Sequence, residues 1–453
     1  MITYQDLLEV EDSDEKRMEF VRLVITDHKA SRFYRDALTA YSYAQKKNET
    51  IMQYQKLLYT ISGQAVPDNY SANWKIRSNF FPRFITQEVQ YLLGNGVSWK
   101  DENTAKKVGK GFESKLQKLG KNALIGGCAY GFWNYDHLEI FDVREFAPIY
   151  DEENGAIRAG VRFWQLEANR PLRATFYEED GYTEYKWVDG EGEVLKKKRP
   201  YIVKIRTSVA DGTEIYDFEN YPGFPVVPLW ANQNHQSELE GIRESIDCYD
   251  LIKSGYANDV DDASLIYWTI QNAGGMDDVD LAKFVERMRT VKAAVVEDSE
   301  ARAEAHAIDV PYASRESLLE RISSDLYRDA MALDTKIIAG GAATATQIRA
   351  AYEPLNSKTD EFEYCIHDFL DEILELAGIP EEQPTFTRSM MLNKSEETQS
   401  ILQAAQFLDA EYVTRKILTI QGDGDMANDM IEKIHADELS RMSLMAQMET
   451  AQE

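Results

Sequence analysis

Two amphipathic stretches separated by a short insert constrain the fold of this chain more than any other feature. Residues 236–264 and 312–333 each place apolar side chains three or four positions apart, which is typical of helices with one buried stripe. The stripes include Leu239, Ile246, Leu318, Ile322 and Leu326. The first stretch would form a rod about 40 Å long, at about 1.5 Å per residue. Because only residues 265–311 separate the stretches, we expect two rods side by side with this insert at their far end.

A loop of small residues follows the second rod and leads into another long helix. Gly340 and Gly341 lower the barrier to loop motion, since glycine has no side chain to restrict the backbone. Thr344 and Gln347 have the spacing of a capping box, which predicts a firm helix start. Pro354 lies well inside the helix, so we expect a kink near residues 350–354.

The rest of the sequence predicts an α+β chain that is mainly helical. We expect helices within 1–60, over 78–93 and over 104–126, because their apolar residues recur with helical spacing. Residues 128–230 contain short aromatic and β-branched runs separated by turn signals, which predicts an antiparallel meander. In the insert we expect strands at 266–270 and 291–296 and a short helix at 281–288. Near the end we expect a short strand at 385–388 and three helices within 395–450.

Size and composition limit the class of protein. With 453 residues the chain exceeds one ordinary core, and its net charge of −28 disfavours adhesion to nucleic acid or anionic membrane. An acidic wall would nevertheless let a DNA duplex slide past, because it repels phosphates rather than gripping them. Three widely spaced cysteines argue against a disulfide framework, and no apolar run approaches the roughly 20 residues that span a bilayer. We therefore expect a soluble protein of the cytoplasm with no membrane partner.

Motifs of known chemistry are missing from the sequence. No P-loop, GxSxG or HExxH pattern occurs, and the six histidines lack metal-ligand spacing. The segment 126–131, Gly-Gly-Cys-Ala-Tyr-Gly, is better explained as a helix-to-strand turn than as a phosphate cradle or a reactive thiol. Acidic pairs such as Asp261-Asp262 and Asp277-Asp278 are expected by chance among 78 acidic residues. We expect no catalytic residue, no metal and no cofactor.

One small basic cluster stands out in this acidic chain. It lies in the insert and consists of Lys283, Arg287, Arg289 and Lys292. A solvated helix face is the simpler explanation of such a cluster. The functional alternative is a contact for an acidic partner surface or for DNA phosphates.

Three stretches together resemble the portal proteins of tailed double-stranded DNA bacteriophages, of the siphophage type. The first runs from Ile76 to Val97 and includes Phe80-Phe81-Pro82 and Leu93-Gly94-Asn95-Gly96. The second is Phe224-Pro225-Val226-Val227-Pro228-Leu229 with the start of the first rod, and the third is Ala343-Thr344-Ala345-Thr346-Gln347-Ile348-Arg349. Their order, with rod, insert, rod, loop and kinked helix between them, carries the resemblance over residues 20–435.

The resemblance implies a division of the chain into named regions. It implies a wing at 1–235, stem helices at 236–264 and 312–333, a clip at 265–311 and a tunnel loop at 334–345. It further implies that the long helix and strand of 346–390 return to the wing and that 391–453 form a helical crown.

The same resemblance implies a structural role in the virion. Such proteins form a ring, usually of about twelve copies, at one capsid vertex. Viral DNA passes through the channel without sequence specificity, driven in by the terminase and later ejected. Head-completion or adaptor proteins dock on the ring, which is assembled with major capsid and scaffold proteins in the host cytoplasm.

The site residues follow from this resemblance together with their chemistry. The expected channel residues are Lys336, Gly340, Gly341, Ala342, Thr344 and Arg349. The expected clip contacts are Lys283, Arg287, Arg289 and Lys292, and the expected packing between subunits uses Leu239, Ile246, Leu318, Ile322 and Leu326. Lys336 would touch phosphate, whereas Arg349 would either do the same or pair within its helix.

Two other classes of function stay open on the sequence alone. One is a phage-derived tail, baseplate or adaptor component that never surrounds DNA. The other is an enzyme with an unrecognised carboxylate site. A closed ring with a channel of duplex width, roughly 20 Å or more, would favour the portal hypothesis over both.

Overall fold

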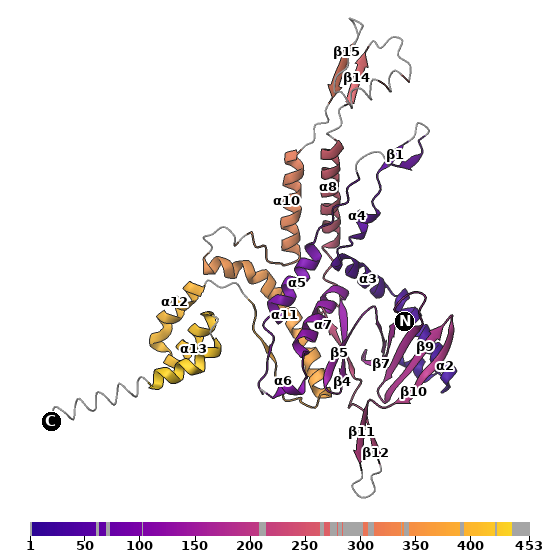
Figure 1. Ribbon diagram of the computed structural model, residues 1–453, viewed down its shortest axis with the longest axis vertical. Helices are drawn as coiled ribbons and strands as arrows, with labels where there is room; N and C mark the ends of the chain where they lie inside the picture. Colours follow the sequence, from indigo (N-terminus) through magenta and orange to yellow (C-terminus); the bar gives the residue numbers. More distant parts are fainter. Residues whose placement is uncertain are drawn as a thin grey trace, which may run out of the picture.

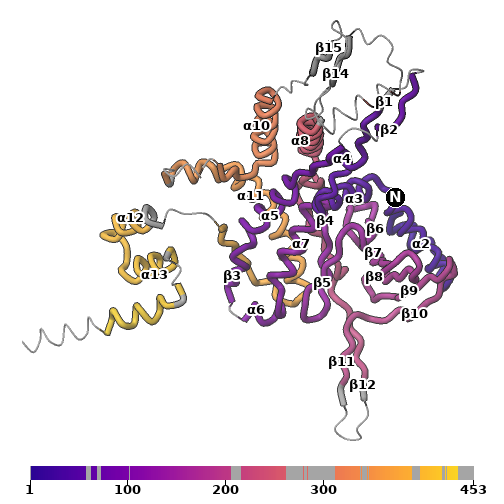
Figure 2. The backbone as a smooth tube through the Cα atoms, turned by 45° about the horizontal axis from the view of Figure 1, so that its top comes forward, coloured from indigo at the N-terminus to yellow at the C-terminus, as the bar shows by residue number. Residues whose placement is uncertain are grey.

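The computed structural model shows an elongated subunit with several projecting parts (Figure 1). It describes residues 2–59, 63–68, 73–101, 103–207, 214–262, 267–271, 279, 283, 302–306, 312–336, 338, 344–389, 394–421 and 424–436. Two helical rods rise from a central body, a β-sheet flanks the body, and a group of small helices lies on its other side (Figures 1 and 2). Helices and strands are both abundant, so the α+β class predicted from the sequence is confirmed.

The central body is built from helices around a small sheet. Its helices are α3 (Arg32–Ala44), α5 (Phe80–Leu93), α7 (Phe112–Gly126) and α11 (Ala345–Leu376). They pack with an antiparallel three-stranded sheet in the order β13-β4-β5, formed by Val226–Trp230, Cys128–Asn134 and His137–Asp142. Phe81, Leu119 and Phe369 are among the side chains that fill this core, each no more than 1% exposed.

The helix expected over 104–126 is in fact two helices. A short α6 (Thr104–Lys107) is followed by α7, which begins only at Phe112. Gly109 and Gly111 between them both have positive φ angles, of 84° and 81°, which a continuous α-helix does not allow. A side chain on Gly109 would also collide with the Asp136 carbonyl oxygen at 2.4 Å, so this break is fixed by packing.

The second sheet is an antiparallel meander with one helix against it. Its five strands follow the order β10-β9-β8-β7-β6. They are Glu191–Arg199, Gly181–Val188, Leu172–Glu178, Ile157–Trp164 and Phe146–Tyr150. Helix α2 (Asp14–Ala30) packs its apolar side chains, including Phe20 and Val24, against this sheet. The single meander expected over 128–230 is therefore divided among separate sheets, because β13 returns to pair with β4.

Four further strand pairs each contain only two strands. They are β1 (Leu57–Tyr59) with β2 (Ala65–Pro67), β11 (Ile202–Thr207) with β12 (Glu214–Glu219), β14 (Tyr267–Gln271) with β15 (Arg302–His306), and β3 (Val97–Ser98) with β16 (Thr385–Phe386). The last pair confirms the strand expected near 385. The β11–β12 hairpin projects from the body away from the rods (Figures 1 and 2).

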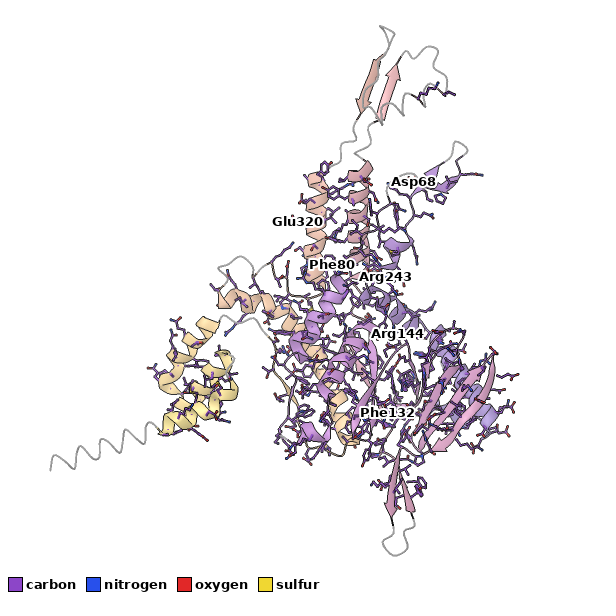
Figure 3. The ribbon with its side chains drawn as sticks, in the orientation of Figure 1. Asp68, Phe80, Phe132, Arg144, Arg243 and Glu320 are labelled. Carbon is purple, nitrogen blue, oxygen red and sulfur yellow. The ribbon has the colours of Figure 1, made fainter. Side chains whose placement is uncertain are left out.

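The two rods are α8 (Arg243–Asp262) and α10 (Tyr312–Asp329), which pack side by side. The first rod is shorter than expected, because residues 238–242 form turns and Gly241 has a φ of 80°. Its 20 residues correspond to about 30 Å. Phe80, at the base of the rods (Figure 3), makes edge-on ring contacts with Tyr249 of α8 at 5.0 Å and with Tyr327 of α10 at 6.1 Å.

The paired strands β14 and β15 of the insert lie beyond the far ends of the rods, as expected (Figure 1). The strand expected at 266–270 is confirmed as β14, and its partner is β15. The sequence did not predict β15, whose residues Arg302-Ala303-Glu304-Ala305-His306 have little strand propensity. The strand expected at 291–296 and nearly all of the helix expected at 281–288 lie outside the described residues.

Helix α11 runs without interruption for 32 residues and contains Pro354. Figure 1 shows it changing direction along its length, as a proline within a helix predicts. After β16 the chain forms α12 (Lys394–Ala404), the 3-10 turn η1 (Ala405–Phe407), α13 (Ala410–Gln421), the 3-10 turn η2 (Gly424–Met426) and a helix over 427–436. The remaining elements are α1 (Tyr4–Leu8) and α4 (Glu49–Gln53).

Candidate functional site

The loop that joins α10 to α11 is held firmly where it leaves the second rod. The Gln87 side chain of α5 donates to the Leu333 carbonyl oxygen at 3.1 Å and accepts from the Leu333 N–H at 3.1 Å. One amide side chain thus pairs with both backbone groups of Leu333, as a neighbouring strand would. Just before this contact, Met331 takes a left-handed φ of 52°, and Ala332 donates to the Tyr327 carbonyl oxygen at 2.9 Å. This is the Schellman ending of a helix, with methionine where glycine is usual.

The other end of the loop is held by the predicted capping box, which the structure confirms. The Thr344 hydroxyl accepts from the Gln347 N–H at 3.3 Å, and the Gln347 side chain accepts from the Thr344 N–H at 3.0 Å. Behind this cap, Tyr352 stacks on Tyr91 of α5 with ring centroids 5.5 Å apart. Leu333 and Leu355 complete this small core, and Ile338 packs against it. Both ends of the loop are therefore anchored to α5.

The expected channel residues are only partly described. Lys336 is exposed in a turn in which its N–H donates to the Asp334 carboxylate at 2.9 Å, and Arg349 is exposed on the first turns of α11. Gly340, Gly341 and Ala342 lie outside the described residues. The structure thus places two exposed cations near the two anchored ends of the loop.

A buried charge cluster fastens the base of the rods to the body. Lys358 of α11 lies with its Nζ 2.9 Å from Glu88 Oε2 of α5 and 2.6 Å from Glu238 Oε2. The same ammonium donates to the Ala330 carbonyl oxygen at 3.3 Å, at the end of α10. The contact between Glu88 and Lys358 is thus a buried ion pair. Sequence spacing gave no sign of this cluster, because its members come from four separate segments.

Burial affects the pKa values of both Glu88 and Lys358. Removal from water raises the pKa of Glu88 above its ordinary range, and the charge of Lys358 opposes the rise. Burial alone would lower the pKa of Lys358, but the two carboxylates outweigh it and hold that pKa above its ordinary value. The cation is therefore the partner that keeps the cluster ionised.

The first rod binds an extended segment of the chain through a row of polar side chains. Asp250, Ser254 and Asn258 accept from the backbone N–H groups of Ser78 at 2.8 Å, Ile76 at 2.9 Å and Trp74 at 2.6 Å. The polar residues recur every four positions, so they lie on one face of α8. We call this row the α8 ladder.

Asp250, at the base of the α8 ladder, is fully buried and also accepts from the Asn48 amide. Burial raises the pKa of Asp250, while hydrogen bonds from Asn48 and Ser78 oppose the rise. Asp250 is therefore a structural acceptor inside the subunit.

The expected subunit-packing residues divide into two groups. Leu239, Ile246 and Leu326 are no more than 4% exposed within the chain's own core, so they are not accessible to a neighbouring subunit. Ile322 is half-buried against the same core, and Leu318 is 44% exposed. Among the five, Leu318 is the side chain that remains on the surface for a contact with another copy.

The expected clip contacts are almost entirely beyond what the structure describes. Lys283 is exposed, and Arg287, Arg289 and Lys292 lie outside the described residues.

Metal-ligating, membrane-spanning and thiol features were looked for in the described part of the chain. No group of three or more metal-ligating side chains occurs there, and none of its helices is both long and apolar enough to cross a membrane. Cys128 is fully buried just after the αL residue Gly127, and burial raises the pKa of its thiol far above the ordinary value. The segment around it is the helix-to-strand turn that the sequence favoured, joining α7 to β4.

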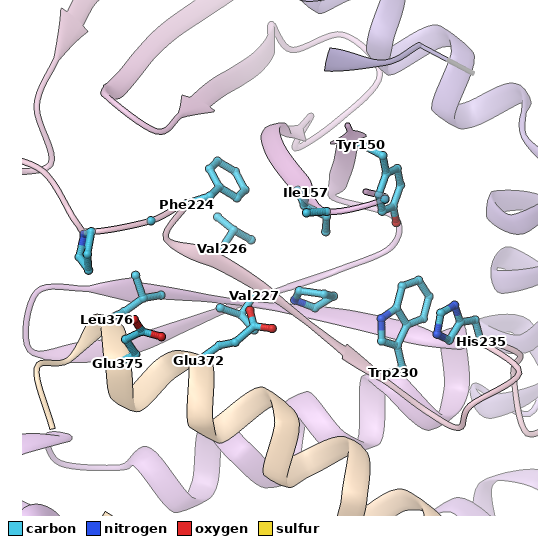
Figure 4. A pocket seen from close by; sticks show the side chains of 15 residues that line it. Tyr150, Ile157, Phe224, Val226, Val227, Trp230, His235, Glu372, Glu375 and Leu376 are labelled. Carbon is cyan, nitrogen blue, oxygen red and sulfur yellow. The ribbon is translucent and has the colours of Figure 1, made fainter. Parts of the chain in front are cut away.

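An open groove runs along β13, with the carboxyl end of α11 on one side and the β6–β7 turn on the other (Figure 4). Its volume is about 880 Å³, and its lining includes Tyr150, Phe224, Val227, Trp230 and Leu376. Trp230 stacks on His235 with ring centroids 3.7 Å apart, and burial lowers the pKa of that histidine. The carboxylates of Glu372 and Glu375 lie at the α11 side. The lining thus combines apolar side chains along β13 with two carboxylates at the α11 side.

Comparison with known proteins identifies the class. A family model described as "Phage portal protein, SPP1 Gp6-like" matches residues 24–448. This match covers most of the chain, which therefore belongs to the SPP1-like family of phage portal proteins. Phage portal proteins are structural components of the virion.

Two relatives are similar over most of their length. The portal protein of Clostridium phage phiCD119 is 23% identical over 431 residues, which cover 88% of this chain and 92% of the relative. The portal protein of Bacillus phage SPP1 is 23% identical over 386 residues, which cover 77% of this chain and 73% of the relative. The family resemblance inferred from the three sequence stretches is confirmed.

Proposed function

We propose that this chain is the subunit of a closed ring of about twelve copies that surrounds viral DNA at one capsid vertex. The terminase drives DNA inward through the ring, and the same channel later serves ejection. The observation that carries this proposal is the loop between α10 and α11, which is anchored to α5 on both sides through Leu333 and Tyr352. These anchors hold both ends of the connection between α10 and α11 in place beside α5.

We propose the following roles for the regions of the fold, as the resemblance to portal proteins suggests. Helices α8 and α10 are the stem, the β14–β15 insert is the clip, and the loop between α10 and α11 is the tunnel loop. The wing consists of the residues up to 235 together with α11, and the helices from α12 onward are the crown. Terminase and then head-completion proteins dock on the clip, whereas capsid and scaffold proteins contact the outer parts of the ring.

The charge of the chain supports passage rather than retention of DNA. A net charge of −28 per subunit repels phosphates along most of the surface. The exposed cations Lys336 and Arg349 near the loop ends would give a few weak, sequence-independent phosphate contacts. Few contacts of this kind allow DNA to slide.

Assembly is tested by negative-stain electron microscopy together with native mass determination, with and without co-expressed capsid and scaffold proteins. The expected result is a closed ring of about twelve times the 51.9 kDa subunit mass. A subunit that stays monomeric under both conditions would overturn the proposal.

The loop is tested separately from the ring. Deletion of Gly340–Ala343 should leave ring mass and appearance unchanged, because the anchors at Leu333 and Thr344 are retained. The same deletion should block DNA packaging, measured as nuclease-protected DNA in particles. Exchange of the four residues for an equally long Gly-Ser sequence is the matched control for loop length. Normal filling by the deletion variant would remove the tunnel-loop assignment while leaving the ring intact.

A further inference from the structure

The β11–β12 hairpin has one apolar and one charged face. In its register Val203 is opposite Phe218, and Ile205 is opposite Tyr216. Because alternate residues of a strand share a face, these four side chains lie on the same side of the hairpin. Lys204 lies on the other side, where its Nζ is 2.6 Å from Glu219 Oε2.

The apolar face is exposed in the subunit. Val203, Ile205, Tyr216 and Phe218 are 46%, 59%, 49% and 64% exposed. Together they present on the order of 400 Å², taking roughly 150–250 Å² for a complete aromatic side chain. Patches of this size on soluble proteins commonly mark binding surfaces, and an isolated two-stranded hairpin is marginally stable in water. The hairpin therefore needs something to cover this face.

The groove along β13 is the complementary surface on the same chain. Its volume of about 880 Å³ exceeds what one side chain fills, and Phe224, Val227, Trp230 and Leu376 make its lining largely apolar. Figure 4 shows Phe224, Val227 and Trp230 spread along the chain through β13, with Leu376 on α11 beside them, so the groove is elongated. Pro228 lies in this edge strand and lacks an N–H, which disfavours strand addition and leaves side-chain docking as the mode of contact.

We propose that the apolar face of the β11–β12 hairpin seats in the β13 groove of the next copy of this chain. The inference rests on the ring assembly proposed above. A ring requires two different complementary surfaces on each subunit, and this chain carries a projecting apolar face and a recessed apolar groove.

The area of the contact favours a second copy over a separate soluble partner. Counted on both sides, the contact would bury about 800 Å², whereas a stable pair of proteins usually needs about 1,200–2,000 Å². Such a contact is too small to hold a separate partner alone. Within a ring it adds to the other contacts between the same two subunits.

Site-directed crosslinking tests this seating in assembled rings. The exposed Cys248 and half-buried Cys365 are first replaced by serine, which leaves only the buried Cys128. Ile205→Cys on the apolar face is then combined with Glu375→Cys in the groove and treated with a short bismaleimide. The expected result is a ladder of crosslinked oligomers on denaturing gels. Lys204→Cys with Glu375→Cys is the matched control, because its thiol lies on the opposite face, and its oligomer yield should be several-fold lower.

Each outcome separates the docking from the ring itself. Rings that form without crosslinked oligomers, or with equal yields for the two pairs, would overturn the hairpin docking and leave the proposed function intact. Absence of rings under all conditions would overturn both. A second variant combines Ile205→Asp with Phe218→Asp, and Lys204→Gln is its control. The double aspartate variant should shift native mass spectra from rings toward subunits, while its circular dichroism spectrum stays unchanged. Normal rings that fail to enter capsids would instead assign the hairpin to a capsid or scaffold protein.

Discussion

At the scale of single residues, Lys358 joins three segments of the chain at the base of the rods. It is a nearly buried cation between two carboxylates, and it also contacts the end of the second rod through the Ala330 carbonyl oxygen. Breaking a buried ion pair leaves an uncompensated charge, which typically costs about 3–5 kcal/mol. Lys358 is therefore one of the contacts that hold the base of the rods to the body.

We expect Lys358→Met to destabilise the subunit by about 3–5 kcal/mol at pH 8 and by clearly less at pH 5. Burial already raises the folded-state pKa of Glu88 above its ordinary value of 4.5, and loss of the cation raises it further. A carboxyl group with a raised folded pKa loses stability as the pH rises from its unfolded value through its folded value. Denaturant unfolding at both pH values measures the difference. The double variant Glu88→Gln with Lys358→Met should show a much weaker pH dependence, whereas equal losses at both pH values would contradict the explanation.

Met331, just after the end of α10, has a strained backbone conformation. Its φ of 52° is left-handed, a conformation that costs an ordinary residue roughly 1–2 kcal/mol. Met331→Gly should raise the free energy of unfolding by about 0.5–1 kcal/mol, since glycine adopts this angle without strain. Thermal unfolding of this variant beside Met331→Ala, which gains nothing in backbone freedom, checks the prediction. A lower melting temperature for the glycine variant would show that the methionine side chain matters more than the backbone.

At the scale of elements, the sequence predicted periodic features well and interruptions poorly. Helix α5, the cap of α11, β14 and both rods follow directly from apolar spacing, capping chemistry and strand propensity. The break between α6 and α7 and the late start of α8 depend on Gly109, Gly111 and Gly241, whose positive φ angles are imposed by tertiary contacts and turns. Strand β15 was missed because pairing with β14, rather than its own propensity, makes it a strand.

The candidate site was predictable only in its local part. The capping box needs two residues three positions apart, so Thr344 and Gln347 were found from sequence. The Gln87–Leu333 pairing joins residues 246 positions apart, and no local pattern indicates such a contact. For the same reason, apolar spacing on the rods could not tell a stripe buried inside the subunit, such as Leu326, from one facing a neighbour.

The α8 ladder should contribute to the stability of the subunit, which we test at Asp250. Asp250→Leu should destabilise the subunit by about 1–3 kcal/mol, because the Ser78 N–H and the Asn48 amide lose a buried acceptor. Glu244→Gln, on an exposed position of the same helix, is the matched control and should be nearly neutral. Chemical denaturation compares the two. Faster hydrogen exchange along residues 74–78 in Asp250→Leu would locate the loss at the ladder, and unchanged exchange there would argue against it.

At the scale of the whole molecule, we expect substitutions on the exposed side of the rods to affect ring assembly and substitutions on the buried side to affect folding. Leu318→Asp should reduce ring formation with little change in subunit stability, because this side chain is 44% exposed and a charge there must be buried when a neighbour packs on it. Leu326→Asp should unfold the subunit itself, since Leu326 is fully buried. Native mass and circular dichroism distinguish the two effects. Normal rings from Leu318→Asp would show that this side of the rod is not an interface.

Helix α11 connects the loop that we assign to DNA contact with the groove that we assign to docking of the next subunit. It begins at the capped end of the loop and ends at the groove along β13, a span of 32 residues or about 48 Å. A stiff rod transmits a push at one end to the other unless it bends, and Pro354 is the position in it where bending costs least. We therefore expect α11 to bend at Pro354 when either of its ends is displaced, so that a displacement at one end is not passed on in full to the other.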